Sequence, residues 1–227
     1  AGIEEVMLLL HPTDNVSQEY CESLMAKDAT WGMKIVFARQ QIAADREKPA
    51  GTADAVYQAL SQHADWQKGR VIVCNSDNLY SVNALKTLLA SEVPQALISY
   101  HRDSLLYPEE RISAFALIRT DAEGYLLEII EKPTKEQADE LMAKQGRLGV
   151  SMNVFVFEAS TFMPYLAKTP FHPVRNEKEL PTSVVMFGEG EGKGFFAIPL
   201  AENVPDLTSK EDILVMQKYL EETYGDF

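Results

Sequence analysis

The sequence predicts an α/β fold in which helices cover both faces of a mixed, mainly parallel β-sheet. Short apolar runs without polar alternation are typical of strands that are buried on both faces. Helical segments separate these runs in the first half of the chain, as the crossovers of a parallel sheet require. A β-hairpin pattern in the second half adds antiparallel strands. We therefore expect a three-layer fold with an added hairpin region, and residues 1–227 are interpreted as a single domain.

The first half of the chain carries strand and helix patterns in the order β-α-β-α-β, followed by one more helix and strand. Strands are predicted at 3–10, 34–38, 71–74 and 96–100, and helices at 17–27, 52–63 and 82–90. In open parallel sheets, ligands bind beyond the carboxyl ends of the strands. The polar residues from Asn75 to Asn78 follow the third strand, so we expect them at that edge.

The second half of the chain changes character. Two β-like runs, 112–119 and 125–130, flank Asp121-Ala122-Glu123-Gly124 and predict a hairpin. The other predicted elements are a helix at 135–144, strands at 150–157 and 195–199, and a closing amphipathic helix at 209–222. Ser209 is expected to be the N-cap of this last helix, and Asp212 to add acidic charge to its first turn.

Charge and composition narrow the classes of partner. The chain has 34 acidic and 21 basic residues, and its net charge of −13 opposes sequence-independent binding to nucleic acid or anionic lipid. A few well-placed Lys and Arg side chains can still bind a compact phosphorylated substrate. No apolar run approaches the ~20 residues of a membrane span, and the first residues lack a basic n-region. We expect a cytoplasmic protein; whether it forms a homo-oligomer is left open.

Several other kinds of site are disfavoured by residue spacing. Cys21 and Cys74 have neither a CxxC partner nor a His at ligand spacing, so both are expected to be reduced core thiols. The four His residues do not pair at i, i+4 with another ligand type, which argues against a zinc site. No Ser lies in a G-x-S-x-G frame. The glycine-rich run at 188–194 lacks phosphate-loop spacing and contains two Glu residues, so it is predicted to be a flexible hairpin turn.

Gly51 and Thr52 introduce the helix predicted at 52–63. Thr52 is the expected N-cap, and the helix N-terminus offers free backbone N–H groups and the positive end of a dipole. Gly51 would let a planar or anionic ligand approach the main chain. An ordinary capped helix explains the same residues, and this stretch alone favours that explanation.

Two carboxylates, Asp77 and Asp206, stand where extended segments end. A lone Asp in such a place is most often a turn or cap residue. A Mg²⁺ site would need one or two carboxylates together with phosphate oxygens, so the two residues are informative only as a pair. Glu131 and Lys132 end the hairpin strand beside Pro133. Lys132 could meet a phosphate and Glu131 sugar hydroxyls, although two solvated charges explain them equally well.

The order of six segments resembles that of the sugar-1-phosphate nucleotidyltransferases. These segments are PAGTADAV, VIVCNSDNLYS, DAEGYLLEIIEKP, GVSMNVFVF, ELPTSVV and VPDLTSKEDI. The resemblance implies a Rossmann-like fold, and a Mg²⁺-dependent reaction in which a sugar 1-phosphate attacks the α-phosphate of a nucleoside triphosphate. The products would be a nucleotide-sugar and pyrophosphate. GTADAVYQ is most similar to the ADP-glucose pyrophosphorylase form, but ELPTS is less specific, and the nucleobase stays open.

The resemblance also implies roles for individual residues. Asp77 and Asp206 would hold Mg²⁺ and, with Lys132, form the catalytic set. The expected substrate-binding residues are Gln40 or Gln41, Gly51 and Thr52 at the nucleobase, Asn78 beside Asp77, Lys132 at the sugar phosphate, Glu131 at the sugar hydroxyls, and Asn153 near the sugar. In-line displacement needs no covalent intermediate, so catalysis would depend on positioning and charge neutralisation.

The chain also departs from the family pattern. The family's first strand and glycine-rich loop have no counterpart here, so the 227 residues as given are expected to be inactive without them. Ser76 replaces a usual Gly, residues 113–115 replace a Tyr-Gly pair, and Asn153 replaces a common Gly. Two alternatives therefore remain. One is a non-catalytic nucleotide-sugar-binding or regulatory homologue, and the other is an unrelated α/β binding domain.

Overall fold

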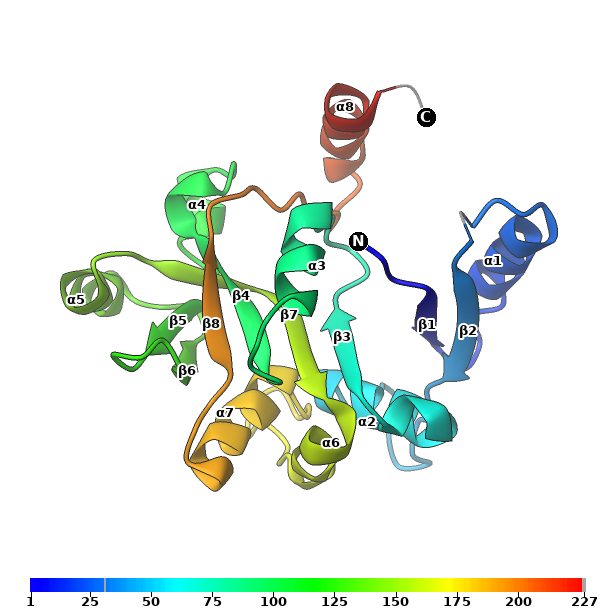
Figure 1. Ribbon diagram of the computed structural model, residues 1–227, viewed down its shortest axis with the longest axis horizontal. Coiled ribbons are helices and arrows are strands. Elements are labelled where there is room, and N and C mark those ends of the chain that lie inside the picture. The colour runs from blue at the N-terminus through cyan, green and yellow to red at the C-terminus, as the bar shows by residue number, and fades with distance from the viewer. Residues whose placement is uncertain (31, 226–227) are drawn as a thin grey trace. The chain divides into compact units, whose positions relative to one another are not determined.

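The computed structural model describes residues 1–30 and 32–225, and it divides the chain into two compact units. Unit 1 consists of Ala1–Val71 and Phe157–Glu191, and unit 2 of Ile72–Val156 and Gly192–Phe227. Each unit is described by itself (Figure 1). The α/β class and the mixed strand pairing are confirmed. The assignment of the whole chain to one domain stays a prediction.

Unit 1 combines a parallel strand pair with helices. The strands β1 (Glu5–Leu10) and β2 (Lys34–Arg39) pair in parallel, with Glu5 opposite Lys34 and Leu10 opposite Arg39. The helix α1 (Val16–Ala26) connects them, and the half-buried Asp14 carboxylate accepts the Ser17 N–H at its start. This unit confirms the predicted parallel β-α-β arrangement at the start of the chain.

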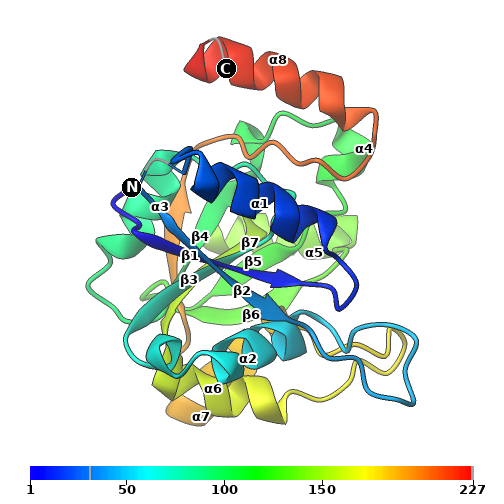
Figure 2. The ribbon, with the colours of Figure 1, turned by 90° about the vertical axis from the view of Figure 1, so that its right-hand side faces the viewer.

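Three further helices of unit 1 pack together, as Figure 2 shows. They are α2 (Thr52–Gln62), α6 (Ala159–Lys168) and α7 (Leu180–Glu191), and a short 3-10 helix, η1 (Ala64–Gln67), follows α2. Phe162 of α6 is fully buried, and its ring lies 5.9 Å from that of Phe187. Two of these helices, α6 and α7, were not predicted from the sequence.

The predicted hairpin turn at 188–194 is wrong, because its first residues form the last turn of α7. A Cβ on Gly190 would lie 2.5 Å from the Tyr165 hydroxyl of α6, so this glycine permits close helix packing. Tyr165 also donates a hydrogen bond of 2.7 Å to the Glu191 carboxylate. Glycine at this position therefore serves a helix contact rather than a turn.

Unit 2 is built on a sheet with the strand order β6-β5-β7-β4-β8, and β3 also pairs with β7. The strands are β3 (Arg70–Cys74), β4 (Ala96–His101), β5 (Leu117–Thr120), β6 (Leu126–Ile130), β7 (Gly149–Glu158) and β8 (Phe196–Leu200). The β4–β8 pair is parallel, whereas β4–β7, β5–β6 and β5–β7 are antiparallel. The β5–β6 hairpin confirms the prediction, and Asp121 Oδ1 accepts the Glu123 and Tyr125 N–H groups in its turn.

Helices cover the sheet of unit 2 (Figure 1). The helices that contact this sheet are α3 (Val82–Leu89) and α5 (Lys135–Gln145). Unit 2 also contains α4 (Glu109–Ile112), α8 (Asp212–Tyr224) and a 3-10 turn, η2 (Arg102–Ser104). Leu88 of α3 and Leu141 of α5 join one buried cluster with strand residues such as Ile98 and Val150. None of the residues of α8 is buried.

Three smaller predictions were wrong. Gly51 is the N-cap of α2, so Thr52 is its first helical residue rather than its cap. The last helix begins at Asp212 after Glu211, and Ser209 lies outside it, because Ser209 donates its N–H and hydroxyl to the Asp212 carboxylate instead. Neither cysteine is a core thiol, since Cys21 is half-buried and Cys74 exposed.

Across residues 1–30 and 32–225, no helix is both long and apolar enough to cross a membrane.

Candidate functional site

Two extended segments of unit 2 meet where β3 ends. Leu79 N–H donates to the Pro205 carbonyl and Leu207 N–H to the Asp77 carbonyl, both at 2.8 Å. Asn78 and Asp206 form the antiparallel bridge between these two bonds. This is the pattern of a non-hydrogen-bonded pair, in which opposite side chains come closest. The backbone thus brings the Asp77–Asn78 and Asp206 segments together.

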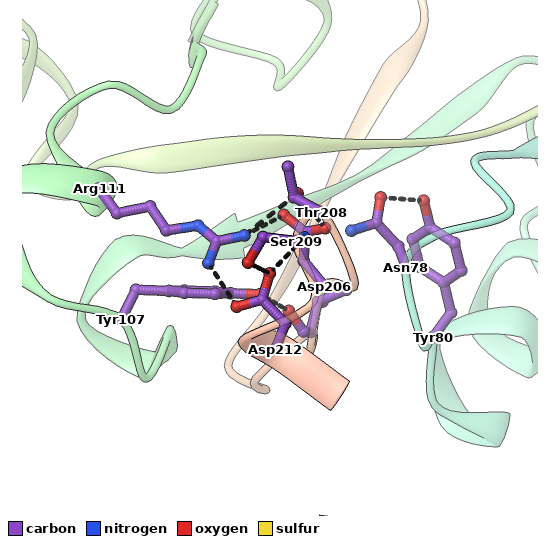
Figure 3. A network of polar contacts seen from close by, with 9 residues as sticks. Asn78, Tyr80, Tyr107, Arg111, Asp206, Thr208, Ser209 and Asp212 are labelled. Carbon is purple, nitrogen blue, oxygen red and sulfur yellow. Dashed lines mark hydrogen bonds and ion pairs between the residues drawn. The ribbon is translucent and has the colours of Figure 1, made fainter. Parts of the chain in front are cut away.

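The two aspartates have different surroundings. Asp77 is exposed, and its carboxylate makes no hydrogen bond or ion pair with the residues that the structure describes. The Asp206 side chain is only 12% exposed, and both of its oxygens have partners (Figure 3). Oδ2 lies 2.7 Å from Arg111 Nη2, and Oδ1 accepts a 2.7 Å hydrogen bond from the Thr208 hydroxyl. One carboxylate is therefore open and the other is engaged.

Arg111, in the short helix α4, is the centre of this polar network. Its Nη1 lies 3.1 Å from Asp212 Oδ1, where α8 begins. Its guanidinium also lies over the Tyr107 ring, 4.8 Å from the centroid, in a cation–π contact. Partial burial disfavours the charged guanidinium, but hydrogen bonds to Asp206 and Asp212 outweigh that effect and raise the pKa of Arg111. Arg111 therefore stays charged and links α4 to both aspartates.

Tyr107 packs its ring against the Arg111 guanidinium. Its hydroxyl donates to the Val204 carbonyl, just before the Asp206 segment. Burial, and then the negative charge of Asp206, raise the pKa of this phenol, so it remains a neutral donor. Phe115 packs edge-to-face on Tyr107 with ring centroids 5.1 Å apart. Phe115 is one of the residues that departs from the family pattern, and here it supports the aromatic ring beneath Arg111.

Tyr80 connects the bridge to β7. Its hydroxyl lies 2.6 Å from the Met152 carbonyl. It also lies 3.1 Å from Asn78 Oδ1, as Figure 3 shows. Burial raises the pKa of Tyr80, which keeps the phenol protonated. A hydroxyl has a single proton to donate, and the shorter contact indicates that Tyr80 donates it to the Met152 carbonyl. Tyr80 thus ties the Asn78 segment to the part of β7 that precedes Asn153.

Asn153 lies in a β-bulge. Leu97 of β4 pairs with Phe155, but Ser99 pairs with Ser151, so β7 carries extra residues between these pairs. Asn153 has a left-handed backbone with φ 54°, and its side chain is half-buried. Bulges of this kind redirect a side chain away from the regular strand alternation. The family's common glycine at this position is consistent with that backbone conformation.

Glu131 and Lys132 follow β6 directly and are both exposed. Lys132 has a left-handed backbone with φ 46°, which is unusual for a residue with a long side chain. The structure records no hydrogen bond or ion pair between Lys132 and the other described residues of the candidate site. Backbone strain that no local contact explains is a reason to suspect a functional position.

Gln41, Gly51 and Thr52 belong to unit 1. Gln58 of α2 holds the Gln41 backbone through its carboxamide, which accepts from Gln41 N–H at 2.5 Å and donates to the Gln41 carbonyl at 3.0 Å. The Gln41 side chain is exposed. This geometry fixes the main chain at Gln41 and leaves its carboxamide available to a ligand.

The start of α2 is already bound by another part of unit 1. Gly51 has φ 120°, and a Cβ there would lie 2.4 Å from the Lys178 carbonyl oxygen. Ala53 N–H donates to that carbonyl at 2.9 Å, and the Thr52 hydroxyl accepts Leu180 N–H at 2.9 Å. The close approach that Gly51 permits is therefore made by the chain's own backbone at Lys178.

Comparison with known proteins assigns the family. Residues 1–182 match the family model described as nucleotidyl transferase. The chain belongs to the nucleotidyl transferase family. The family resemblance found in the sequence is thereby confirmed.

Curated relatives of this nucleotidyl transferase chain include two glucose-1-phosphate adenylyltransferases. The small subunit of the Triticum aestivum enzyme is 32% identical over 136 residues, which are 60% of this chain and 27% of the relative. The Cutibacterium acnes enzyme is 29% identical over 119 residues, which are 47% of this chain and 27% of the relative. The matched region thus spans about a quarter of the length of these relatives.

Solved structures support the fold of the nucleotidyl transferase chain. A nucleoside-diphosphate-sugar pyrophosphorylase from Vibrio cholerae RC9 has a TM-score of 0.62 and 9% identity, over 94% of this chain and 80% of that one. A UDP-glucose pyrophosphorylase complexed with UDP-glucose has a TM-score of 0.67 and 14% identity, over 96% and 81%. At these identities the likeness concerns the fold, and it confirms the predicted Rossmann-like class.

The residue types at the strand bridge fit a hard cation. Asn78 lies opposite Asp206 in the bridge, and Asp77 precedes Asn78 in the chain. All three side chains carry oxygen ligands of the kind that Mg²⁺ prefers. Within residues 1–30 and 32–225 there is no cluster of three or more His, Cys, Asp or Glu side chains suited to a metal. A Mg²⁺ ion held by one or two carboxylates and substrate phosphates does not need one.

Sequence reasoning missed Arg111, Tyr107, Tyr80 and Thr208. Arg111 lies in a charged stretch that the sequence placed next to a hairpin strand, and only the tertiary structure brings it to Asp206. Tyr80 gave a weak signal, since it is an aromatic residue directly after the polar segment that follows β3. No comparable signal marks Tyr107 or Thr208.

Proposed function

We propose that this nucleotidyl transferase chain transfers a nucleotidyl group to a sugar 1-phosphate. The observation that carries the proposal is the backbone bridge between the Asp77–Asn78 and Asp206 segments in a chain of this family. The names of the curated relatives suggest glucose 1-phosphate and ATP as the first pair of substrates to test. The name of one structural neighbour makes UTP the next nucleotide.

In the proposed reaction, a phosphate oxygen of the sugar 1-phosphate attacks the α-phosphorus of the nucleoside triphosphate. The bond from the α-phosphorus to the oxygen that bridges it to the β-phosphate breaks, and pyrophosphate leaves with the electron pair. Asp77 and Asp206 would hold Mg²⁺, which supplies neutralisation of the phosphate charge. Since no covalent intermediate forms, the remaining residues act by binding and orienting the two substrates.

Several residues have proposed roles in substrate binding. Lys132 would contact the sugar phosphate as a point charge, while Glu131 accepts sugar hydroxyls. Asn153, in the bulge of β7, would contact the sugar, and Asn78 would assist beside Asp77. Gln41 would face the nucleobase, whereas Gly51 and Thr52, the other two residues expected there, are engaged by the backbone of Lys178 and Leu180. The exposed Gln41 carboxamide, with its backbone held by Gln58, supports this role most directly.

A second candidate function is nucleotide-sugar binding without turnover. It is favoured by one observation, namely that the Asp206 carboxylate is already paired with Arg111. This candidate and the first differ in what they predict for catalysis, because only the first requires pyrophosphate release.

The deciding experiment is a pyrophosphate-release assay of the purified protein that contains this chain. ATP or UTP is combined with glucose 1-phosphate and Mg²⁺, and the Asp77→Asn variant is compared with Glu92→Gln. Glu92 is an exposed carboxylate in the loop before β4, so its variant controls for the loss of one negative charge. We expect Asp77→Asn to lower turnover by at least about 100-fold and Glu92→Gln to leave it near wild type. Ligand binding without pyrophosphate release would favour the second candidate.

A further inference from the structure

The Asp206 carboxylate presents a conflict, because the residue proposed to bind a cation is already paired with one. Arg111 Nη2 lies 2.7 Å from Asp206 Oδ2, and the Thr208 hydroxyl donates a hydrogen bond to Asp206 Oδ1. The Asp206 and Arg111 side chains are only 12% and 31% exposed, so water screens their attraction less than at an open surface. A divalent cation approaching Oδ2 meets a positive charge at hydrogen-bonding distance.

We propose that Arg111 is an internal counter-cation that competes with the divalent metal for Asp206. This inference rests on the proposed function, and it adds a residue that sets the metal affinity of the site. In the absence of metal, Arg111 neutralises Asp206 and keeps its carboxylate in place. When the metal binds, the guanidinium leaves Oδ2.

The second partner of Arg111 makes this exchange feasible. Nη1 lies 3.1 Å from Asp212 Oδ1, so the guanidinium remains paired with a carboxylate after it releases Asp206. Tyr107 keeps the guanidinium stacked on its ring, with 4.8 Å between the Arg111 central carbon and the ring centroid. A buried charge without any partner would be costly, and this arrangement avoids that cost.

Competition between Arg111 and the metal for Asp206 predicts opposite changes in metal affinity for two variants. Removing the Arg111 charge frees Asp206, so the metal binds more tightly. Removing Asp212 leaves Arg111 with Asp206 as its remaining carboxylate partner within the described network, so the metal binds more weakly. A purely structural role for Arg111 predicts the opposite result for its own removal, because a disordered Asp206 would bind the metal less well.

The test is a titration with Mn²⁺ alone, followed by the electron paramagnetic resonance signal of the free ion. Arg111→Gln is compared with Arg102→Gln, which removes the same charge from a neighbouring pair with Glu109. We expect the Kd for Mn²⁺ to be about fivefold lower in Arg111→Gln and unchanged in Arg102→Gln. Equal Kd values in the two variants, or weaker binding in Arg111→Gln, would overturn the proposal.

A second pair of variants protects the test against misfolding of Arg111→Gln, which circular dichroism melting would reveal. Asp212→Asn should weaken Mn²⁺ binding more than Glu211→Gln, which removes an exposed neighbouring carboxylate. An equal effect of these two variants would also overturn the proposal. Asp77→Asn separates this inference from the proposed function. If Mn²⁺ binding does not depend on Asp77, the proposed metal site itself is wrong. If Mn²⁺ binding does depend on Asp77, the comparison of Arg111→Gln with Arg102→Gln decides whether Arg111 competes with the metal.

Discussion

The α-carbon of Gly51 faces the backbone of Lys178 so closely that a methyl group between them would lie 2.4 Å from the carbonyl oxygen. This contact joins the start of α2 to the segment that leads into α7, both within unit 1. It explains a glycine that the sequence alone associated with a ligand. It also yields a prediction about stability.

Gly51→Ala should lower the free energy of unfolding by about 3 kcal/mol or more, because it adds a backbone clash to a left-handed conformation. Gly69→Ala is the matched control, since Gly69 also has a positive φ of 80° but has no atom within 4 Å of the added Cβ. Its expected cost is about 1 kcal/mol. Urea unfolding of both variants measures the difference, and equal losses would contradict the role of the Lys178 contact.

Lys132→Gly should make the protein more stable and less active. Glycine adopts the φ of 46° at this position without the penalty that a Lys side chain carries, and the expected gain is about 0.5–1 kcal/mol. Lys132→Ala removes the same charge but keeps the backbone penalty. Thermal melts should therefore separate the two variants, while pyrophosphate release should fall in both. A Gly variant no more stable than the Ala variant would show that the backbone at Lys132 is not strained.

Asn153→Gly should keep the stability of the protein within about 0.5 kcal/mol, because glycine accepts the left-handed bulge conformation. Asn153→Val should cost about 2 kcal/mol, since a β-branched residue is disfavoured at positive φ. If the Asn153 side chain contacts the sugar, the Gly variant should also raise the KM for the sugar 1-phosphate. An unchanged KM in a stable Gly variant would remove Asn153 from the substrate site.

Acidification should remove a stabilising contribution from Asp212. Its pKa is lowered below the ordinary value of about 3.8, mainly by the Ser209 N–H and hydroxyl and further by Arg111. A carboxyl whose folded pKa is depressed stabilises the fold above its unfolded pKa, and it loses that effect as the pH falls through the folded value. The difference in Tm between the wild type and Asp212→Asn should thus be constant above about pH 5 and shrink towards pH 3. A difference that grows on acidification would contradict this assignment.

The parts of the fold that could be predicted depend on local patterns. Apolar runs located β1 and β2, and the Asp121 to Gly124 turn located the β5–β6 hairpin, because each pattern is satisfied within a few residues. Helix α6 contains Pro164 and α7 contains Gly188 and Gly190, so local propensity argues against both helices. The packing of α6 and α7 against each other and against α2 decides the outcome, and a local pattern cannot contain that information.

In the candidate site too, residues marked by a local pattern could be predicted, and residues that depend on distant contacts could not. Asp77 and Asp206 could be nominated because each ends an extended segment, and the structure brings their segments together through the Asn78 bridge. Arg111 could not be nominated, since its partners Asp206 and Asp212 lie far along the chain and no spacing rule links them to it. Gly51 was correctly singled out as a place of close approach, but the sequence cannot tell a ligand from the chain's own backbone.

The bridge between Asn78 and Asp206 has a consequence for biosynthesis. Strand β3 is translated early, but its Asp206 partner belongs to a segment that follows β8 and is made much later. A nascent chain that has released β3, β4 and β7 from the ribosome holds Asp77 without the second carboxylate. The proposed cation binding at this pair would therefore have to await the emergence of the segment after β8, since the order of synthesis keeps an unfinished chain from assembling the pair.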